Sequence, residues 1–264
     1  MNTKIRLIAV DMDGTLVNDK KEIPEEFFDW VPAHPQVHVV IASGRPYYTN
    51  YQLFERIADK MIFIGDNGGI IYAGGKIIYQ NALTKEEVAQ CLSLLKDEKL
   101  AEPILCAAEK GICRHPGNDK EYEKQVHTYF TKYQYTDDLN AAAEDNQIIK
   151  IATYIREKKA AEVSAKITEW PEAVNAVLGG PEWIDLVHKD VNKGAALKKL
   201  QEILGISKEE TMAFGDYLND LTMLKEAGES YAMANSHPTI LRIARHTAPS
   251  NNYKGVMRIL NQKF

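Results

Sequence analysis

The chain has 264 residues, enough for one large domain or two modest ones, and its 45% hydrophobic and 26% charged residues are ordinary for a globular protein. Its formal net charge of −5 argues against a generic nucleic-acid surface, which is normally basic, so we expect no nucleic-acid partner. The three cysteines form no C-x-x-C pair, and the sequence shows neither a secretory signal nor an apolar run near the ~18 residues of a membrane span. We therefore expect a soluble, cytoplasmic protein with inert thiols and no membrane partner.

The first third of the chain alternates strand and helix patterns. The apolar run at residues 5–10 predicts a strand buried on both faces of a parallel sheet, and residues 37–42 and 61–64 predict two more strands. Helices are expected between them at residues 24–30 and 47–59, and a β-hairpin at residues 70–79 turns on Gly74-Gly75. This β-α-β-α order predicts parallel pairing of the first three strands.

The pattern changes between residues 83 and 183. A helix is predicted at residues 84–95, where Thr84 and Glu87 have the spacing of a capping box. Further helices are expected at 120–131 and 158–167, and strands at 103–107, 111–114, 147–155, 174–178 and 183–187. This mixture, which carries no dense cluster of catalytic residue types, predicts an α+β domain (83–183) inserted into a core made of residues 1–82 and 184–264.

The alternating pattern then resumes. Lys193 opens a predicted helix with Leu197, Leu200 and Leu204 on one face, and Gly205 stops it. Short strands are expected at residues 211–214 and 231–234, each followed by a helix. The predicted fold class is thus α/β, with a doubly wound parallel sheet and an inserted α+β domain.

Polar side chains follow three of the predicted core strands. They are Asp11 and Asp13 after the first strand, Ser43 and Arg45 after the second, and Asp216, Asn219 and Asp220 after the strand at 211–214. In a parallel doubly wound sheet these strand ends lie at one edge. An isolated D-x-D-G segment could be a solvated turn, but four aspartates in one cleft repel each other, which a hard cation such as Mg²⁺ resolves. Lys193, at the start of a helix, supplies positive charge suited to a phosphoryl group.

Four of these segments, taken in order, resemble the motifs of a known superfamily. Residues 11–16 (DMDGTL), Ser43-Gly44-Arg45, Lys193-Gly194 and residues 215–220 (GDYLND) are similar to the four motifs of the haloacid dehalogenase-like superfamily, and the long insert resembles that of its Cof-type (class IIB) phosphatases. The resemblance runs from Leu7 to Gly255-Val256. It departs from the family pattern at Asp185, where glutamate is frequent, and at Asp190, where glycine is usual.

The resemblance implies a Rossmann-like core, an inserted cap domain, and a Mg²⁺-dependent phosphatase that hydrolyses small phosphomonoesters such as sugar phosphates or related metabolites. Asp11 would be the nucleophile that forms an aspartyl-phosphate, and Asp13 the general acid and base. Asp11, Asp216 and the backbone carbonyl of Asp13 would hold Mg²⁺. The remaining residues would assist: Ser43, Gly44, Lys193 and Asn219 at the phosphoryl oxygens, Arg45 near the substrate, Thr15 steadying its loop or Asp13, and Asp220 orienting Lys193 or a metal-bound water, or capping the following helix.

Other interpretations stay open. The same fold could serve as a non-catalytic metabolite-binding or regulatory module, or as a phosphomutase-type transferase that passes the phosphoryl group to a sugar hydroxyl. A dinucleotide-binding oxidoreductase is disfavoured because no G-x-G-x-x-G follows the first strand. Asn67 resembles an asparagine common in the family, although Asp66-Asn67-Gly68 is also ordinary turn chemistry. A monomer is the default expectation.

Overall fold

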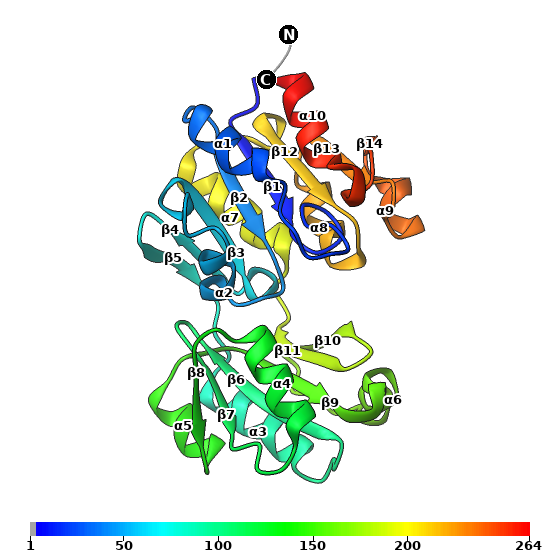
Figure 1. The fold of residues 1–264 in the computed structure, drawn as a ribbon. Helices are drawn as coiled ribbons and strands as arrows, with labels where there is room; N and C mark the ends of the chain where they lie inside the picture. The colour runs from blue at the N-terminus through cyan, green and yellow to red at the C-terminus, as the bar shows by residue number, and fades with distance from the viewer. Residues whose placement is uncertain (1–3) are drawn as a thin grey trace. The chain divides into compact units, whose positions relative to one another are not determined.

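The computed structural model describes residues 4–264, and the chain divides into two compact units. The first unit consists of the residues up to Ser43, Asn50–Tyr79 and Asn192–Phe264, and the second of Gly44–Thr49 and Gln80–Val191 (Figure 1). The second boundary lies later than the expected residue 184. The reason is that β11 (Trp183–His188) pairs along its length with β9 (Ile148–Ile155) and β10 (Val174–Gly180), so it belongs to the sheet of the second unit.

The sheet of the first unit has the order β14-β13-β12-β1-β2-β3-β4-β5. Neighbours from β14 to β3 are parallel, and β4 is antiparallel to β3. The strand bounds are β1 Leu7–Asp11, β2 His38–Ala42, β3 Met61–Gly65, β4 Ile70–Ala73, β5 Lys76–Gln80, β12 Thr211–Gly215, β13 Glu229–Met233 and β14 His246–Ala248. The chain leaves β1 toward β2 on one side and returns to β12 on the other, so the topological switch point, where open α/β sheets bind ligands, lies between β1 and β12.

Helices cover both faces of this sheet, as the fully buried sequence of β1 predicts (Figure 1). On one face, Leu7 and Ala9 belong to a core that includes Leu197 of α7 and residues of α8 and α9. On the other, Phe27 of α1 packs edge-on against Phe54, which in turn contacts Phe63 of β3. The bounds are α1 Glu25–Ala33, α2 Tyr47–Leu53, α7 Lys193–Leu204, α8 Leu221–Lys225, α9 Pro238–Ile243 and α10 Gly255–Lys263. The predicted doubly wound α/β class is confirmed.

Two predictions for this unit need correction. The helix expected at residues 47–59 ends at Leu53, because Phe54, Glu55 and Ile57 continue with tighter hydrogen bonds to the residue three positions back. These turns let Phe54 and Ile57 become buried. The strand β14 was not predicted. It has three residues, and Ala248 is the one of them whose side chain is buried, so the sequence offers almost no periodic signal.

The second unit is a sheet of order β10-β11-β9-β6-β7-β8 with helices on both faces. One core contains residues of α3, α5 and α6, and α4 packs Tyr122 and Val126 against the opposite face. The bounds not yet given are β6 Ala101–Ala107, β7 Gly111–Arg114, β8 Tyr133–Thr136, α3 Lys85–Lys96, α4 Lys120–Tyr129, α5 Leu139–Asp145 and α6 Ala160–Lys166. The predicted capping box of Thr84 and Glu87 is confirmed at the start of α3. The sequence did not predict β8 and α5.

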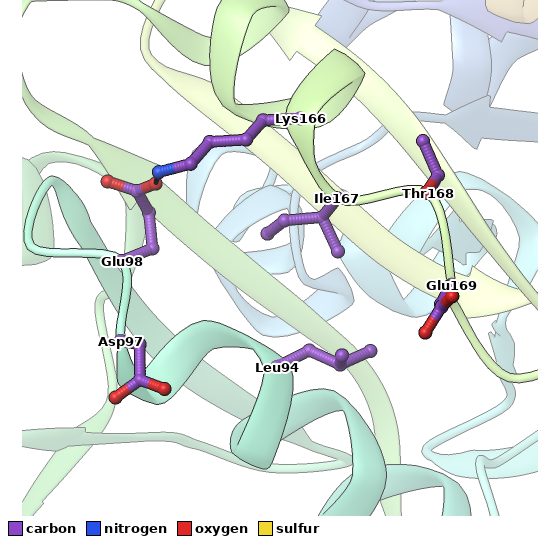
Figure 2. A pocket seen from close by; sticks show the side chains of 7 residues that line it. All are labelled: Leu94, Asp97, Glu98, Lys166, Ile167, Thr168 and Glu169. Carbon is purple, nitrogen blue, oxygen red and sulfur yellow. Dashed lines mark hydrogen bonds and ion pairs between the residues drawn. The ribbon is translucent and has the colours of Figure 1, made fainter.

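A hollow lies in the second unit between the end of α3 and the segment that follows α6 (Figure 2). Its lining residues are Leu94, Asp97, Glu98, Lys166, Ile167, Thr168 and Glu169. The ammonium of Lys166 contacts Glu98 at 2.6 Å, so the positive charge in this lining is already neutralised by a carboxylate of the same lining. This arrangement does not suit an anionic substrate. Among the described residues, no helix combines the length and apolar character that crossing a membrane requires.

Candidate active site

The carboxyl ends of β1 and β12 bring two predicted site residues together. The strands are parallel neighbours with Val10 opposite Phe214, so Asp11 at the end of β1 and Asp216 just after β12 share one edge. Gly14 makes this approach possible. Its φ of +85° lies in the left-handed region, and a Cβ there would come within 2.4 Å of Oδ2 of Asp216. The glycine of the D-x-D-G segment is therefore a packing requirement of the site.

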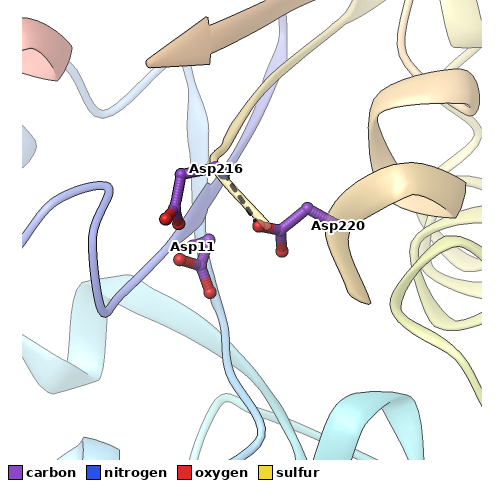
Figure 3. A group of neighbouring side chains, drawn as sticks. All are labelled: Asp11, Asp216 and Asp220. Atoms are coloured by element: carbon purple, nitrogen blue, oxygen red, sulfur yellow. Dashed lines mark hydrogen bonds between the residues drawn. The ribbon is translucent and has the colours of Figure 1, made fainter. Parts of the chain in front are cut away.

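Three carboxylates meet at this edge. Asp11, Asp216 and Asp220 each offer an oxygen, and these oxygens all lie within 4.8 Å of one another. Figure 3 shows the side chains of Asp11, Asp216 and Asp220 gathered in one place, with the hydrogen bond between Asp216 and Asp220 marked. Asp11 and Asp220 are almost fully buried, with 6% and 0% of their surface exposed. Asp216 is partly buried, and three carboxylates held so close together in this setting require compensating positive charge.

Lys193 supplies one positive charge from the first position of α7. Its ammonium donates to Oδ1 of Asp11 at 2.6 Å and to Oδ1 of Asp220 at 2.7 Å, and its surface is 0% exposed. The helix begins there because Asn192 is the N-cap, accepting a hydrogen bond from the Ala195 backbone N–H. An ammonium has three donors, so two bonds to carboxylates leave a third for another anion.

Asp220 is fixed on its other side by the backbone. Its Oδ2 accepts from the N–H groups of Asp216 and Tyr217 at 2.9 and 3.0 Å, while Oδ1 accepts from Lys193. Because both oxygens are used in this way, Asp220 orients the lysine and shapes the loop that carries Asp216. It is the residue before α8, but its side chain forms no cap hydrogen bond to that helix.

The electrostatics follow from burial. Burial raises the pKa of Asp11 well above its usual value, the nearby charge of Asp220 adds to this, and Lys193 acts in the opposite direction. Burial, followed by the charge of Asp220, raises the pKa of Asp216 to about 6. Burial alone would lower the pKa of Lys193, but the charges of Asp11 and Asp220 outweigh it and raise that pKa, so the lysine stays protonated.

The acid cluster suits a divalent cation. Three carboxylates against one ammonium leave two negative charges, which a single Mg²⁺ would balance. The donor set is all oxygen, as Mg²⁺ prefers, and the raised pKa values of Asp11 and Asp216 report repulsion that a cation would relieve. The residues present therefore fit the predicted metal.

Asp13 and Thr15 make contacts that the sequence did not predict. The carboxylate of Asp13 contacts the ammonium of Lys21 at 2.8 Å, rather than joining the three gathered acids. The Thr15 hydroxyl donates to Oδ1 of Asp216 at 3.0 Å, although we expected it to steady its loop or Asp13. Thr15 therefore helps to orient one of the proposed metal ligands.

Ser43 and Asn219 belong to the same unit, and both contact Asn67. The Ser43 backbone N–H donates to the carbonyl of Ile64 at 2.9 Å, and the residue is buried just after β2. Asn219 donates from Nδ2 to Oδ1 of Asn67 at 3.2 Å. Gly44 and Arg45 belong to the segment Gly44–Thr49, which groups with the second unit. There the carbonyl of Gly44 accepts from the buried ammonium of Lys150 at 2.8 Å.

Two supporting residues were missed by sequence reasoning. Lys21, with a φ of 64°, reaches Asp13 from the loop that follows the first motif. Asn235 donates from Nδ2 to the carbonyl of Gly14 at 2.8 Å, and its Oδ1 accepts from the N–H of Asn251 at 3.1 Å. The distance along the chain, more than 200 residues for Asn235 and Gly14, hides such a contact from local patterns.

A mostly parallel α/β sheet with an acid cluster and a buried lysine at its switch point is the arrangement expected of an enzyme that acts on an anionic substrate. The chain belongs to the haloacid dehalogenase-like hydrolases, whose family model matches residues 8–260. It is 30% identical over 266 residues to the 5-amino-6-(5-phospho-D-ribitylamino)uracil phosphatase YbjI of Escherichia coli, covering 98% of this chain and 96% of that protein. It is 26% identical to the phosphatase YwpJ of Bacillus subtilis, covering 97% of this chain and 99% of that protein. Its relatives are named as phosphatases, and the chain is an enzyme of that class.

Solved structures give the same fold. A haloacid dehalogenase-like hydrolase from Bacteroides thetaiotaomicron superimposes with a TM-score of 0.87 at 25% identity, covering 99% of this chain and all (100%) of that one. The subclass IIB sugar phosphatase BT4131 has a TM-score of 0.76 at 22% identity, covering 97% and 98%. This second likeness shows the fold, which is that of a haloacid dehalogenase-like enzyme with the long insert.

Proposed function

We propose that the protein is a Mg²⁺-dependent phosphatase that hydrolyses small phosphomonoesters through an aspartyl-phosphate on Asp11. The observation that carries the proposal is the meeting of Asp11, Asp216 and Asp220 around the buried ammonium of Lys193 at the strand ends. A lone nucleophilic carboxylate would not need two further acids within 4.8 Å, whereas a carboxylate beside a cation and a phosphoryl group does.

In the first half-reaction, a carboxylate oxygen of Asp11 bonds to phosphorus while the bond from phosphorus to the ester oxygen breaks. Lys193 favours the ionised form of Asp11 that this attack requires, because its ammonium lies 2.6 Å from Oδ1 and acts against the effect of burial. Asp13 gives its proton to the departing ester oxygen. The product of this half is the aspartyl-phosphate and the free alcohol.

In the second half-reaction, Asp13 takes a proton from water as the water oxygen attacks phosphorus. The bond between phosphorus and Asp11 then breaks, which regenerates the carboxylate and releases inorganic phosphate. The ammonium of Lys21, which contacts Asp13 at 2.8 Å, places a positive charge beside this carboxylate. The pair is exposed, so its contribution is modest.

Mg²⁺, held by Asp11, Asp216 and the backbone carbonyl of Asp13, would supply charge neutralisation between the nucleophile and the phosphoryl group. Thr15 orients Asp216, and Asp220 orients Lys193. We assign the phosphoryl oxygens to Ser43, the amide of Gly44, the third N–H of Lys193 and Asn219, with Arg45 toward the rest of the substrate.

We assign to the inserted unit the role of a cap that selects the leaving group. Sugar phosphates and related metabolites are the proposed substrates. The Escherichia coli relative supports this class, because its named substrate carries a phosphate on a ribityl chain. That compound therefore belongs in the first substrate panel beside hexose and pentose phosphates and nucleotides.

The test is release of inorganic phosphate from this panel by the purified protein, with Mg²⁺ and with a chelator. We expect turnover with Mg²⁺, its loss on chelation, and its loss in Asp11→Asn with the fold intact, since this change removes the nucleophile's charge and little volume. Near-normal activity of Asp11→Asn would discard the covalent mechanism. No release from any ester would favour a binding or regulatory module, and an isomerised sugar phosphate without free phosphate would reveal a transferase.

A further inference from the structure

The turn Asp66–Gly68, which joins β3 to β4, has an unusual backbone. The φ angles of Asp66, Asn67 and Gly68 are 52°, 56° and 108°, so three successive residues occupy the left-handed region. L-residues other than glycine rarely adopt this region, although asparagine tolerates it better than most. Strained turns of this kind persist where the surrounding structure fixes them, often next to functional groups.

Asn67 connects two segments that carry proposed phosphate-binding residues. Its backbone N–H donates to the carbonyl of Ser43 at 3.0 Å, and its side-chain Oδ1 accepts from Nδ2 of Asn219 at 3.2 Å. The Ser43 N–H in turn donates to the carbonyl of Ile64 in β3, the strand that leads into the turn. One residue of the turn therefore sets Ser43 and Asn219 relative to each other, although they lie 176 positions apart in the numbering.

The same turn also packs against the start of α7. A Cβ at Gly68 would lie 2.3 Å from the backbone carbonyl of Asn192, the N-cap residue of the helix that begins with Lys193. No side chain can be accommodated there without displacing the helix. The turn thus contacts all three segments of the first unit that supply phosphoryl-binding groups in the proposed function.

We propose that Asn67 is a positioning residue that orients the amide of Asn219 toward the phosphoryl group. A primary amide has two N–H donors, and Asn67 accepts one of them through Oδ1. That bond fixes which end of the Asn219 amide is nitrogen and directs the second N–H away from Asn67. The inference rests on the proposed function, because it takes a phosphoryl group to lie at this edge of the sheet.

The variant Asn67→Gly separates two roles of this residue: its backbone conformation in the turn and the contact of its side chain with Asn219. Glycine accepts the left-handed backbone and keeps the N–H that binds Ser43, but it removes the oxygen that Asn219 contacts. The matched control is Glu157→Gly, the same kind of change at a φ of 60° in the second unit. Asn219→Ala and the double variant Asn67→Gly/Asn219→Ala complete the set.

The affinity of each protein for inorganic phosphate is measured by calorimetry with Mg²⁺ present, together with kcat and KM for the best ester. We expect Asn67→Gly to weaken phosphate binding by about 5- to 10-fold, the typical effect of one lost hydrogen bond. The double variant should bind phosphate no more weakly than Asn219→Ala, because Asn67 acts through Asn219. Glu157→Gly should match the wild type.

Phosphate affinity of Asn67→Gly within twofold of the wild type would overturn the inference, and so would losses that multiply in the double variant. The two proposals fail in different ways. If the wild type hydrolyses no ester but binds phosphate in a manner that depends on Asn67, the proposed function falls and this inference stands. If the wild type is an active phosphatase and Asn67→Gly binds phosphate equally well, the proposed function stands and this inference falls. A wild type that binds no phosphate overturns both.

Discussion

The substitution Lys193→Met tests the charge balance of the site most directly. The lysine side chain is 0% exposed and contacts Asp11 and Asp220 at 2.6 and 2.7 Å. Methionine fills a similar volume but leaves both carboxylates buried without their cation. Loss of one partner from a buried ion pair typically costs about 3–5 kcal/mol. At roughly 2–4 °C per kcal/mol, the unfolding midpoint at pH 8 with a chelator should fall by about 6–20 °C.

The loss should depend on pH. The pKa of Asp11 is already raised by burial and by the charge of Asp220, and removing the ammonium raises it further. A carboxyl with a raised pKa in the fold becomes protonated on acidification before its unfolded counterpart does, so the fold gains stability relative to the unfolded chain as the pH falls. The gap between Lys193→Met and wild type should therefore be smaller at pH 5 than at pH 8, and millimolar Mg²⁺ should close part of it at pH 8.

The assay is thermal unfolding followed by circular dichroism, with urea unfolding for the free energies. Lys199→Met is the matched control, because Lys199 lies on the same helix but contacts Glu202 at 3.3 Å with 46% of its side chain exposed. Such pairs contribute about 0–1 kcal/mol. Equal losses of unfolding free energy in the two variants, or a loss below about 1 kcal/mol for Lys193→Met, would refute the reasoning. The buried contacts of Lys193 with Asp11 and Asp220 would then not be a source of stability.

Two further changes probe the proposed acid and the metal site. Asp13→Asn should lower kcat/KM for the hydrolysis of esters with poor leaving groups by a larger factor than kcat/KM for nitrophenyl phosphate. Equal losses on both substrates would rule out the acid role. Because the pKa of Asp216 is about 6 in the fold against 3.8 in the unfolded chain, chelated wild type should lose about 1–2 kcal/mol of stability, after allowance for solvent screening, as the pH rises from 4 to 6. Asp216→Asn should lack that slope in urea titrations and bind Mg²⁺ more weakly by calorimetry, and an unchanged slope would contradict this pKa.

Much of the core could be predicted because its signals are local. Apolar runs followed by acids predicted β1 and β12, and the leucine spacing with Gly205 predicted the bounds of α7. Parallel pairing then implied that Asp11 and Asp216 meet, since the carboxyl ends of parallel neighbours share an edge. Periodicity and topology together therefore place the acids without any side-chain detail.

The supporting contacts could not be predicted in the same way. Lys21, Asn67 and Asn235 are polar residues in turns, where the sequence predicts solvation, and their partners depend on how distant loops pack. The strand β8 (Tyr133–Thr136) was missed for a related reason: its side chains are exposed or half-buried, so the period-two alternation of a buried face is absent. Local sequence patterns indicate which side chains are buried, whereas these polar contacts and this exposed strand depend on how distant segments pack together.

The place of β1 in its sheet has a consequence for synthesis on the ribosome. Leu7 pairs with His38 on one side and with Thr211 on the other. While the chain is emerging, the first partner arrives early, but the second edge of β1 stays open until more than 200 residues have been made. The sheet of the second unit, built from residues 101–188, is complete before then. We therefore expect the nascent chain to expose the unpaired edge of an apolar strand late into translation, the kind of surface that chaperones bind.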